Sequence, residues 1–365
     1  MPRDNDYDHT VPRRSDGTRQ TLRPVQPWPT GKPFKILSID GGGILGILPC
    51  MILAEIEKRF LDGEPIGKHF DMIVGTSTGG IIALGLGQGK SAEEISKLYI
   101  ERGRFIFPGN RMTRWLRGWA GWVFTPYDRG NLENELRREF GDGLFGSSTI
   151  STCIPSFDGR YGEPYVFKTP HHPDYKKDQH ERLVDVGLST AAAPTIFSAV
   201  KRNGYVFADG GIWANNPAMI GVVDAMTCYD IDRTQIRLLT LGCGQESYRM
   251  RWWHRIGGKL VWAGLFVSSA MRAQSHNALG QAGLLIGRSN MIRLDAPEVA
   301  SRIGMDDVGR ALAEMPPVAR SLAEASGHTI SEMFLQSAES TSSHFGGKKT
   351  DVGANIEEAD VSTIR

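Results

Sequence analysis

The chain has 365 residues and a formal net charge of +1, and 23% of its residues are charged. A length of this order accommodates one large domain with additions, and the balanced charge excludes a general electrostatic attraction to nucleic acid. The four cysteines are widely separated and form no CxxC pair, so neither a disulfide framework nor a zinc site is indicated. We therefore expect core thiols, no bound metal, no required cofactor and no nucleic-acid partner.

Residues 1–33 are polar and rich in Arg, Asp and Pro, and they contain no apolar stretch of signal-peptide length. This composition predicts a flexible N-terminal arm. Further along the chain, no apolar run approaches the ~20 residues that a membrane-spanning helix needs. The sequence favours a cytoplasmic protein, and one that acts on lipid would lie on a membrane rather than span it.

The first predicted element is a buried strand over residues 34–39, which ends at Asp40 and leads into the glycine loop Gly41, Gly42 and Gly43. A helix with apolar residues at helical spacing follows. The backbone amides of such a loop are suited to stabilise the oxyanion that forms when a nucleophile attacks an ester carbonyl. The loop is therefore predicted to form an oxyanion hole.

The same loop admits a second interpretation, because Gly41, Gly43 and Gly46 also match the GxGxxG fingerprint of dinucleotide-binding folds. That fingerprint needs an acidic residue at the end of the next strand, to hold the ribose. Here Asp71 precedes the strand and lies at its opposite end. A catalytic loop is favoured, and a nucleotide-binding module without enzymatic activity is the alternative.

The next strand, over residues 72–74, leads into a GxSxG turn that contains Ser77, and an apolar helix over residues 78–86 follows. This spacing is that of a nucleophile elbow, a strand-to-helix turn so tight that small residues must flank the serine. The helix N-terminus favours developing negative charge at the serine. Ser77 is therefore the predicted nucleophile, and a glycine-rich turn without chemistry is the alternative.

Three further elements are predicted between residues 91 and 168. A helix over residues 91–102 begins with a capping box of Ser91 and Glu94 and is expected to end at Gly103. Apolar residues at helical spacing predict a helix around residues 132–140, and a strand is expected over residues 164–168.

A segment between these helices is rich in tryptophan and arginine. Residues 111–124 place three tryptophans on one helix face and interleave three arginines, which is typical of a helix at a membrane interface. Packing of the rings into the core is the alternative. The predicted contacts with substrate or membrane are Trp115, Trp119, Trp122, Arg111, Arg114 and Arg117.

A short apolar strand over residues 205–208 delivers Asp209 into Gly210 and Gly211, the same strand-then-glycine arrangement that presents Ser77. A free aspartate is a weak base with a pKa near ~4, but burial raises that value. Asp209 is therefore the predicted general base, and a cap of the following turn is its alternative role.

None of the nine histidines lies in a comparable motif. An esterase of the α/β-hydrolase type, with a Ser-Asp-His triad, would need a late histidine. His254 and His276 are the candidates for that alternative.

The last predicted elements are a strand over residues 237–241 and helices around residues 263–287 and 307–324. Strands that alternate with helices predict an α/β fold with a mainly parallel sheet and its site at the carboxyl ends of the strands. The predicted domain organisation is an arm over 1–33, a hydrolase core over 34–245, a helical C-terminal extension over 246–336 and a mobile tail over 337–365.

Four motifs occur in the order found in patatin-like phospholipases, and the chain resembles that family over residues 34–245. The motifs are Ser38-Ile39-Asp40-Gly41-Gly42-Gly43-Ile44, Gly75-Thr76-Ser77-Thr78-Gly79-Gly80, Ala191-Ala192-Ala193-Pro194, and Asp209-Gly210-Gly211 with Asn215-Asn216-Pro217.

The resemblance implies a three-layer sandwich, with a mainly parallel central sheet flanked by helices. It implies a dyad of Ser77 and Asp209 without a catalytic histidine, an oxyanion hole at Gly41–Gly43, and cleavage of acyl esters of membrane phospholipids. One departure is Leu45, where the family commonly has Arg or Lys.

Within the family, the motif forms look like those of bacterial phospholipase effectors of anti-phage signalling. That similarity implies activation by a cyclic dinucleotide and degradation of the membrane from its inner face. The oligomeric state is left open, a homo-oligomer being one alternative.

Overall fold

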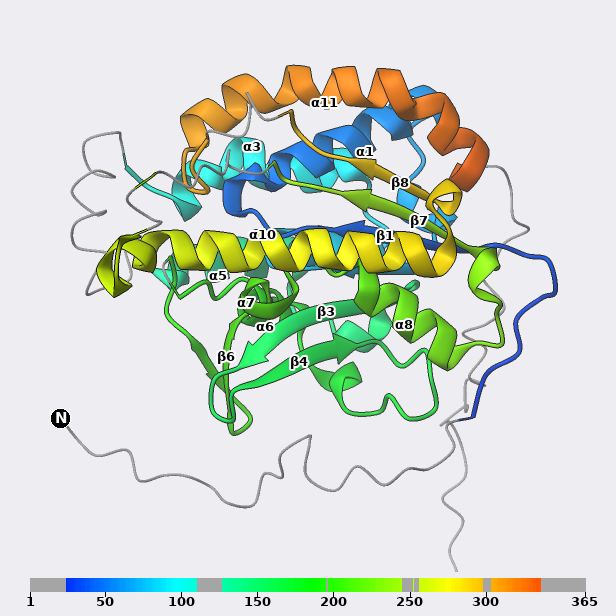
Figure 1. The fold of residues 1–365 in the computed structure, drawn as a ribbon, viewed down its shortest axis with the longest axis horizontal. Helices are drawn as coiled ribbons and strands as arrows, with labels where there is room; N and C mark the ends of the chain where they lie inside the picture. Colours follow the sequence, from blue (N-terminus) through cyan, green and yellow to red (C-terminus); the bar gives the residue numbers. More distant parts are fainter. Residues whose placement is uncertain are drawn as a thin grey trace, which may run out of the picture.

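The structure is a computed structural model that describes residues 24–109, 127–194, 196–244, 252, 256–297 and 303–335 (Figure 1). Most of the predicted arm and all of the predicted tail lie outside these residues. The described end of the arm, residues 24–33, packs against the body of the protein, where the Gln26 amide donates to the carbonyl of Cys228 at 2.8 Å. Trp28 lies against the rings of Phe34 and Tyr229.

A single eight-stranded sheet forms the centre, in the order β5-β6-β3-β2-β1-β7-β8, with β4 paired to β3. The strands β3, β2, β1, β7 and β8 are parallel, whereas β4, β5 and β6 join through antiparallel pairs. The bounds are β1 Phe34–Ile39, β2 Met72–Gly75, β3 Ser151–Asp158, β4 Glu163–Lys168, β5 Val200–Arg202, β6 Tyr205–Asp209, β7 Ile236–Leu241 and β8 Met291–Leu294.

Helices cover both faces of the sheet, because its central strands are apolar on both sides. In β1, Leu37 and Ile39 face the larger hydrophobic cluster, whereas Phe34 and Ile36 face the smaller one. Figure 1 shows α11 lying along α1 on one side and the long helix α10 crossing near α8 on the other. The helices are α1 Ile47–Phe60, α2 Thr78–Gly87, α3 Ala92–Ile106, α5 Arg129–Phe140, α6 Leu183–Thr190, α7 Gly211–Ala214, α8 Ala218–Cys228, α10 Lys259–Ile286 and α11 Val308–Ile330.

The predicted three-layer α/β sandwich is confirmed, but two helices end later than predicted: α3 ends at Ile106 instead of residue 102, and α11 ends at Ile330 instead of near residue 324. Helix α3 has the predicted capping box of Ser91 and Glu94 but continues through Gly103 to Ile106. Gly103 is a packing residue, since a Cβ there would lie 2.8 Å from the Cδ1 atom of Ile44. Among the described helices, none is long and apolar enough to cross a membrane.

The segment predicted as a helical extension also contributes to the sheet. Besides α10 and α11, it supplies β8, which pairs in parallel with β7. Thr240 of β7 stands opposite Arg293 of β8 in this register. The C-terminal third therefore reaches the carboxyl ends of the parallel strands, where the predicted site lies.

Candidate active site

Ser77 occupies a sharp turn between β2 and α2. Its backbone has φ +54°, in the left-handed region that non-glycine residues rarely adopt. A Cβ on Gly75 would lie 2.1 Å from the carbonyl oxygen of Gly79, and one on Gly79 would lie 2.3 Å from that of Ile39. The small residues of the GxSxG spacing are therefore required by backbone packing, and the turn presents a half-buried Ser77 at the N-terminus of α2.

Asp209, at the end of β6, contacts the serine directly. The Ser77 hydroxyl donates to Asp209 Oδ2 at 2.7 Å, and the amide of Gly211 donates to Asp209 Oδ1 at 2.6 Å. One carboxylate oxygen thus accepts from the candidate nucleophile while the other is fixed by the backbone. The two residues are 132 positions apart in the chain and are brought together by the fold.

Burial makes Asp209 a better base than a free aspartate. Desolvation raises the pKa of this carboxyl to about 6, against the opposing effect of the hydrogen bonds from Ser77 and Gly211. The carboxyl is therefore ionised at neutral pH, with a proton affinity closer to that pH than a solvated aspartate has.

In the described part of the chain, no imidazole contacts the pair of Ser77 and Asp209. His276 lies on α10 and is exposed, and no histidine in the described part of the chain hydrogen-bonds to Ser77 or Asp209. His254, the other candidate for a triad, lies outside the described residues. The contact that a triad histidine would make with the serine is made here by Asp209.

The glycine loop lies against the serine, with one correction to the predicted oxyanion hole. The amide of Gly41 donates to the carbonyl of Asn215 at 3.0 Å, so this N–H is already committed. Gly42 and Gly43 line the cavity that contains Ser77, and their amides find no acceptor among the described residues. Two of the three predicted amides therefore stay available.

The loop can lie so close only because it lacks side chains. A Cβ on Gly42 would lie 2.3 Å from the Cβ of Cys243, and one on Gly43 would lie 2.5 Å from the carbonyl oxygen of Met305. Gly43 also has φ +59°, which favours glycine. These contacts fix the loop between the end of β7 and the start of α11.

Two buried threonines that the sequence interpretation missed hold the elbow in place. The Ser77 amide donates to Thr190 Oγ1 at 2.9 Å, and that hydroxyl donates to the carbonyl of Pro155 at 2.6 Å. Thr76 donates to the carbonyl of Ala214 at 2.6 Å. The position of Thr190, directly before the Ala-Ala-Ala-Pro motif, was the available signal.

The dinucleotide interpretation receives no support from the position of its acidic residue. Asp71 lies at the amino end of β2, where its carboxylate accepts from the amide of Lys35 at 2.8 Å. A ribose-binding carboxylate belongs at the carboxyl ends of the strands.

A mainly apolar cavity of about 350 Å³ opens beside Ser77 and Asp209. Polar atoms of Ser77, Asp209 and the glycine loop meet at one part of its wall. The rest of the lining comes from α2, α3, α5, α7, α10 and loops beside them, and includes the apolar residues Leu98, Ile106, Phe107, Leu132, Phe197 and Met271. A cavity of this kind suits a ligand with a long hydrocarbon portion and one polar reacting group.

Comparisons with known proteins agree with this geometry. A family model described as "Patatin-like phospholipase" matches residues 37–222, just over half of the chain. The chain belongs to this family. It is 33% identical over 313 residues to a "cGAMP-activated phospholipase" of Vibrio cholerae serotype O1, a match that covers 75% of this chain and 85% of that relative.

Two further relatives with the same description match a shorter segment. The chain is 37% identical to an Escherichia coli (strain TW11681) protein over 230 residues, and to one of Pseudomonas aeruginosa (strain BWHPSA011 / Pa011) over 199 residues. These matches cover 59% and 54% of this chain, and 64% and 59% of the relatives, which is less than two thirds of their lengths.

Leu45, which stands where the family commonly has a cation, is buried in the larger hydrophobic cluster. The predicted contacts with substrate or membrane all lie outside the described residues; they are Trp115, Trp119, Trp122, Arg111, Arg114 and Arg117.

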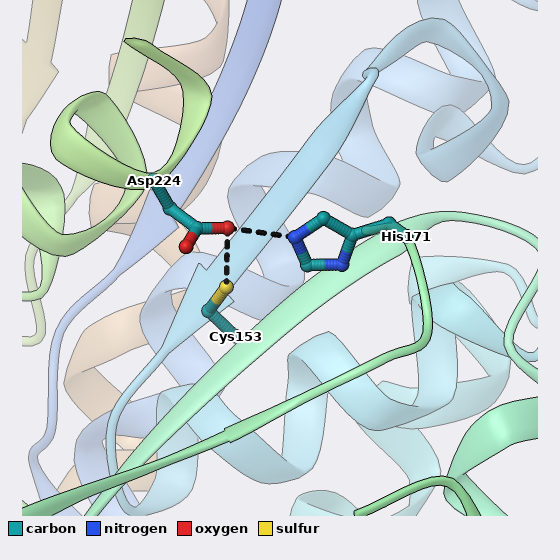
Figure 2. A group of neighbouring side chains, drawn as sticks. All are labelled: Cys153, His171 and Asp224. Carbon is teal, nitrogen blue, oxygen red and sulfur yellow. Dashed lines mark hydrogen bonds and ion pairs between the residues drawn. The ribbon is translucent and has the colours of Figure 1, made fainter. Parts of the chain in front are cut away.

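A second polar cluster lies between β3, the segment after β4, and α8. Figure 2 shows His171 and Cys153 both directed at one oxygen of Asp224, at 2.6 Å and 3.5 Å. These three side chains are of types that bind metals. However, the other Asp224 oxygen already contacts the Lys168 ammonium and the Tyr175 hydroxyl, and burial raises the pKa of the Cys153 thiol. The carboxylate is thus neutralised by a protein cation, and the cluster fits a structural network better than a metal site.

Proposed function

We propose that this chain is a serine acyl hydrolase of the phospholipase A type, which cleaves fatty acyl esters of membrane glycerophospholipids. The observation that carries the proposal is the 2.7 Å hydrogen bond from Ser77 to Asp209 at the wall of a mainly apolar cavity. Membership of the patatin-like phospholipase family supports the same reaction class.

In the first half of the proposed reaction, Ser77 attacks the ester carbonyl. Asp209 takes the hydroxyl proton as the bond from Oγ to the carbonyl carbon forms, and the amides of Gly42 and Gly43 stabilise the oxyanion. The ester C–O bond then breaks, and the proton passes from Asp209 to the departing alcohol oxygen. The products of this half are a lysophospholipid and an acyl group on Ser77.

In the second half, water replaces the alcohol. Asp209 takes a proton from the water as its oxygen attacks the acyl carbon, and the bond to Ser77 Oγ breaks. The proton returns to Ser77, and the fatty acid leaves. The apolar cavity holds the acyl chain throughout, so its burial contributes binding free energy at the reacting centre.

We further infer that a cyclic dinucleotide switches the enzyme on, in bacterial anti-phage defence at the inner face of the membrane. The support is the description of three relatives as cGAMP-activated phospholipases. The ligand would act as an activator and not as a reactant, because the dyad needs no cofactor for acyl transfer.

The test is hydrolysis of phospholipid vesicles by the purified protein, with and without a panel of cyclic dinucleotides. We expect fatty acid release that rises with one of the nucleotides and is abolished in Ser77→Ala. The matched control is Ser147→Ala, which removes an exposed hydroxyl that bonds to Gln88 and to the carbonyl of Leu144. Unchanged release in Ser77→Ala, or nucleotide binding with no hydrolysis under any condition, would contradict the proposal.

A further inference from the structure

Arg293, in the C-terminal strand β8, reaches the start of the catalytic glycine loop. Its guanidinium donates to Asp40 Oδ2 at 2.7 Å, to Asp295 Oδ2 at 2.6 Å and to Thr240 Oγ1 at 2.9 Å. Asp40 directly precedes Gly41, and 253 positions separate it from Arg293. Both β8 and Arg293 lie beyond residues 37–222, the segment that the family model matches.

The pair is buried, which makes its two charges interdependent. The side chain of Asp40 is 4% exposed and that of Arg293 is 17% exposed. Burial raises the pKa of Asp40 to about 6 even though Arg293 opposes that shift. Without the guanidinium, the carboxylate would lose its cation while remaining out of water, and removing one partner of such a pair is costly.

A second contact joins the same C-terminal region to the other end of the loop. The amide of Ile44 donates to the carbonyl of Met305 at 2.8 Å, and Gly43 packs against that carbonyl. Gly42 and Gly43 therefore lie between two anchors, the ion pair at Asp40 and the hydrogen bond at Ile44.

We propose that Arg293 is a positioning residue for the reaction, which holds Asp40 and thereby sets the Gly42 and Gly43 amides against the oxyanion. The inference rests on the proposed function, because it assigns those amides to the transition state. It makes the C-terminal strand part of the catalytic apparatus.

The activity test compares Arg293→Ala and Arg293→Lys with wild type, using kcat and KM for one phospholipid or ester substrate. We expect Arg293→Ala to lower kcat about 100-fold, the effect of misplacing a catalytic group by about 1 Å, with KM changed less than about threefold. Arg293→Lys keeps a cation and should recover part of kcat. The double variant Arg293→Met/Asp40→Asn, which removes both charges, should have a higher kcat than Arg293→Met alone.

Arg202→Ala is the matched control. Arg202 also bridges two carboxylates, Glu181 at 2.7 Å and Asp185 at 2.7 Å, with its side chain 26% exposed. It lies on the edge strand β5. Comparable losses of kcat in Arg202→Ala and Arg293→Ala would reduce Arg293 to a stability role and overturn the inference, as would wild-type kcat in both Arg293 variants.

Hydrogen exchange of a peptide over residues 40–46 tests the positioning without any activity. We expect the fastest exchange there in Arg293→Ala, a smaller increase over wild type in Arg293→Lys, and no change in Arg202→Ala. Unchanged exchange in both Arg293 variants overturns the inference. Faster exchange together with a wild type that stays inactive with every cyclic dinucleotide of the panel would refute the proposed function, while leaving the positioning of the loop by Arg293 established.

Discussion

The Asp209→Asn variant is expected to lose hydrolysis and to gain stability, with a gain that depends on pH. Asparagine has nearly the same shape and can still accept the hydrogen bond from Gly211, but it cannot take the Ser77 proton. Desolvation raises the pKa of Asp209 from its ordinary value of 3.8 to about 6, so the folded state bears a cost for keeping this carboxylate ionised. The variant removes that cost.

The size of the gain follows from the two pKa values. The difference between the pKa values of 3.8 and about 6 corresponds to a gain of about 3 kcal/mol in the free energy of unfolding at pH 8, where the carboxyl is ionised in both the folded and the unfolded chain. As pH falls below about 6, the folded protein takes up the proton first and the cost declines, to roughly half near pH 5. The gain in Asp209→Asn should shrink over the same range.

The assay is thermal or urea unfolding of wild type and Asp209→Asn at about pH 8 and pH 5, with ester hydrolysis measured in parallel. A stabilising substitution that abolishes activity is the pattern expected of a carboxylate retained for function. The reasoning is refuted if Asp209→Asn is destabilised at pH 8, or if its stability relative to wild type does not depend on pH.

Three further predictions concern single contacts. Asp224→Asn should have the opposite effect and lower the free energy of unfolding by about 3 kcal/mol or more at neutral pH. The reason is that His171 and Lys168 lower the pKa of Asp224, so its carboxylate stabilises the fold while it is ionised. In urea unfolding, the difference from wild type should therefore decline at acid pH. Gly42→Ala should lower kcat about 100-fold in an ester assay, since its Cβ would lie 2.3 Å from that of Cys243; wild-type kcat would contradict the assigned loop geometry. Thr190→Val removes the acceptor of the Ser77 amide and should cost about 1–3 kcal/mol in unfolding free energy as well as activity; a neutral result in both would exclude Thr190 as a support of the elbow.

Sequence patterns predicted those elements of the fold whose own residues carry a strong local pattern. Strand β1, the turn at Ser77 and helix α2 combine an apolar run with glycines whose spacing has a steric reason. The sequence also predicted a catalytic role for Asp209, because this residue ends a strand and precedes two glycines. The distance between Ser77 and Asp209, in contrast, depends on how β2 and β6 are placed in the sheet, which no local pattern contains.

Strand β3 gave no such signal, because half of its residues are polar and Pro155 interrupts it, although every residue except Phe157 is buried. Ser156 lies in it, fully buried, and its hydroxyl bonds to the carbonyls of Ser189 and Ala208 at 3.0 Å and 2.9 Å. Strand β8 has only four residues, too few for a periodic pattern. The contact between Arg293 and Asp40 was likewise beyond prediction, because 253 positions separate the two residues.

The central claim is that Ser77 carries the acyl group with Asp209 as its base. It is tested most directly by treating the protein with a serine-reactive fluorophosphonate, with and without cyclic dinucleotide, and locating the adduct by peptide mass spectrometry. We predict one adduct on the peptide that contains Ser77, absent in Ser77→Ala and formed far more slowly in Asp209→Asn. An adduct on another serine, or labelling of Asp209→Asn at the wild-type rate, would contradict the account.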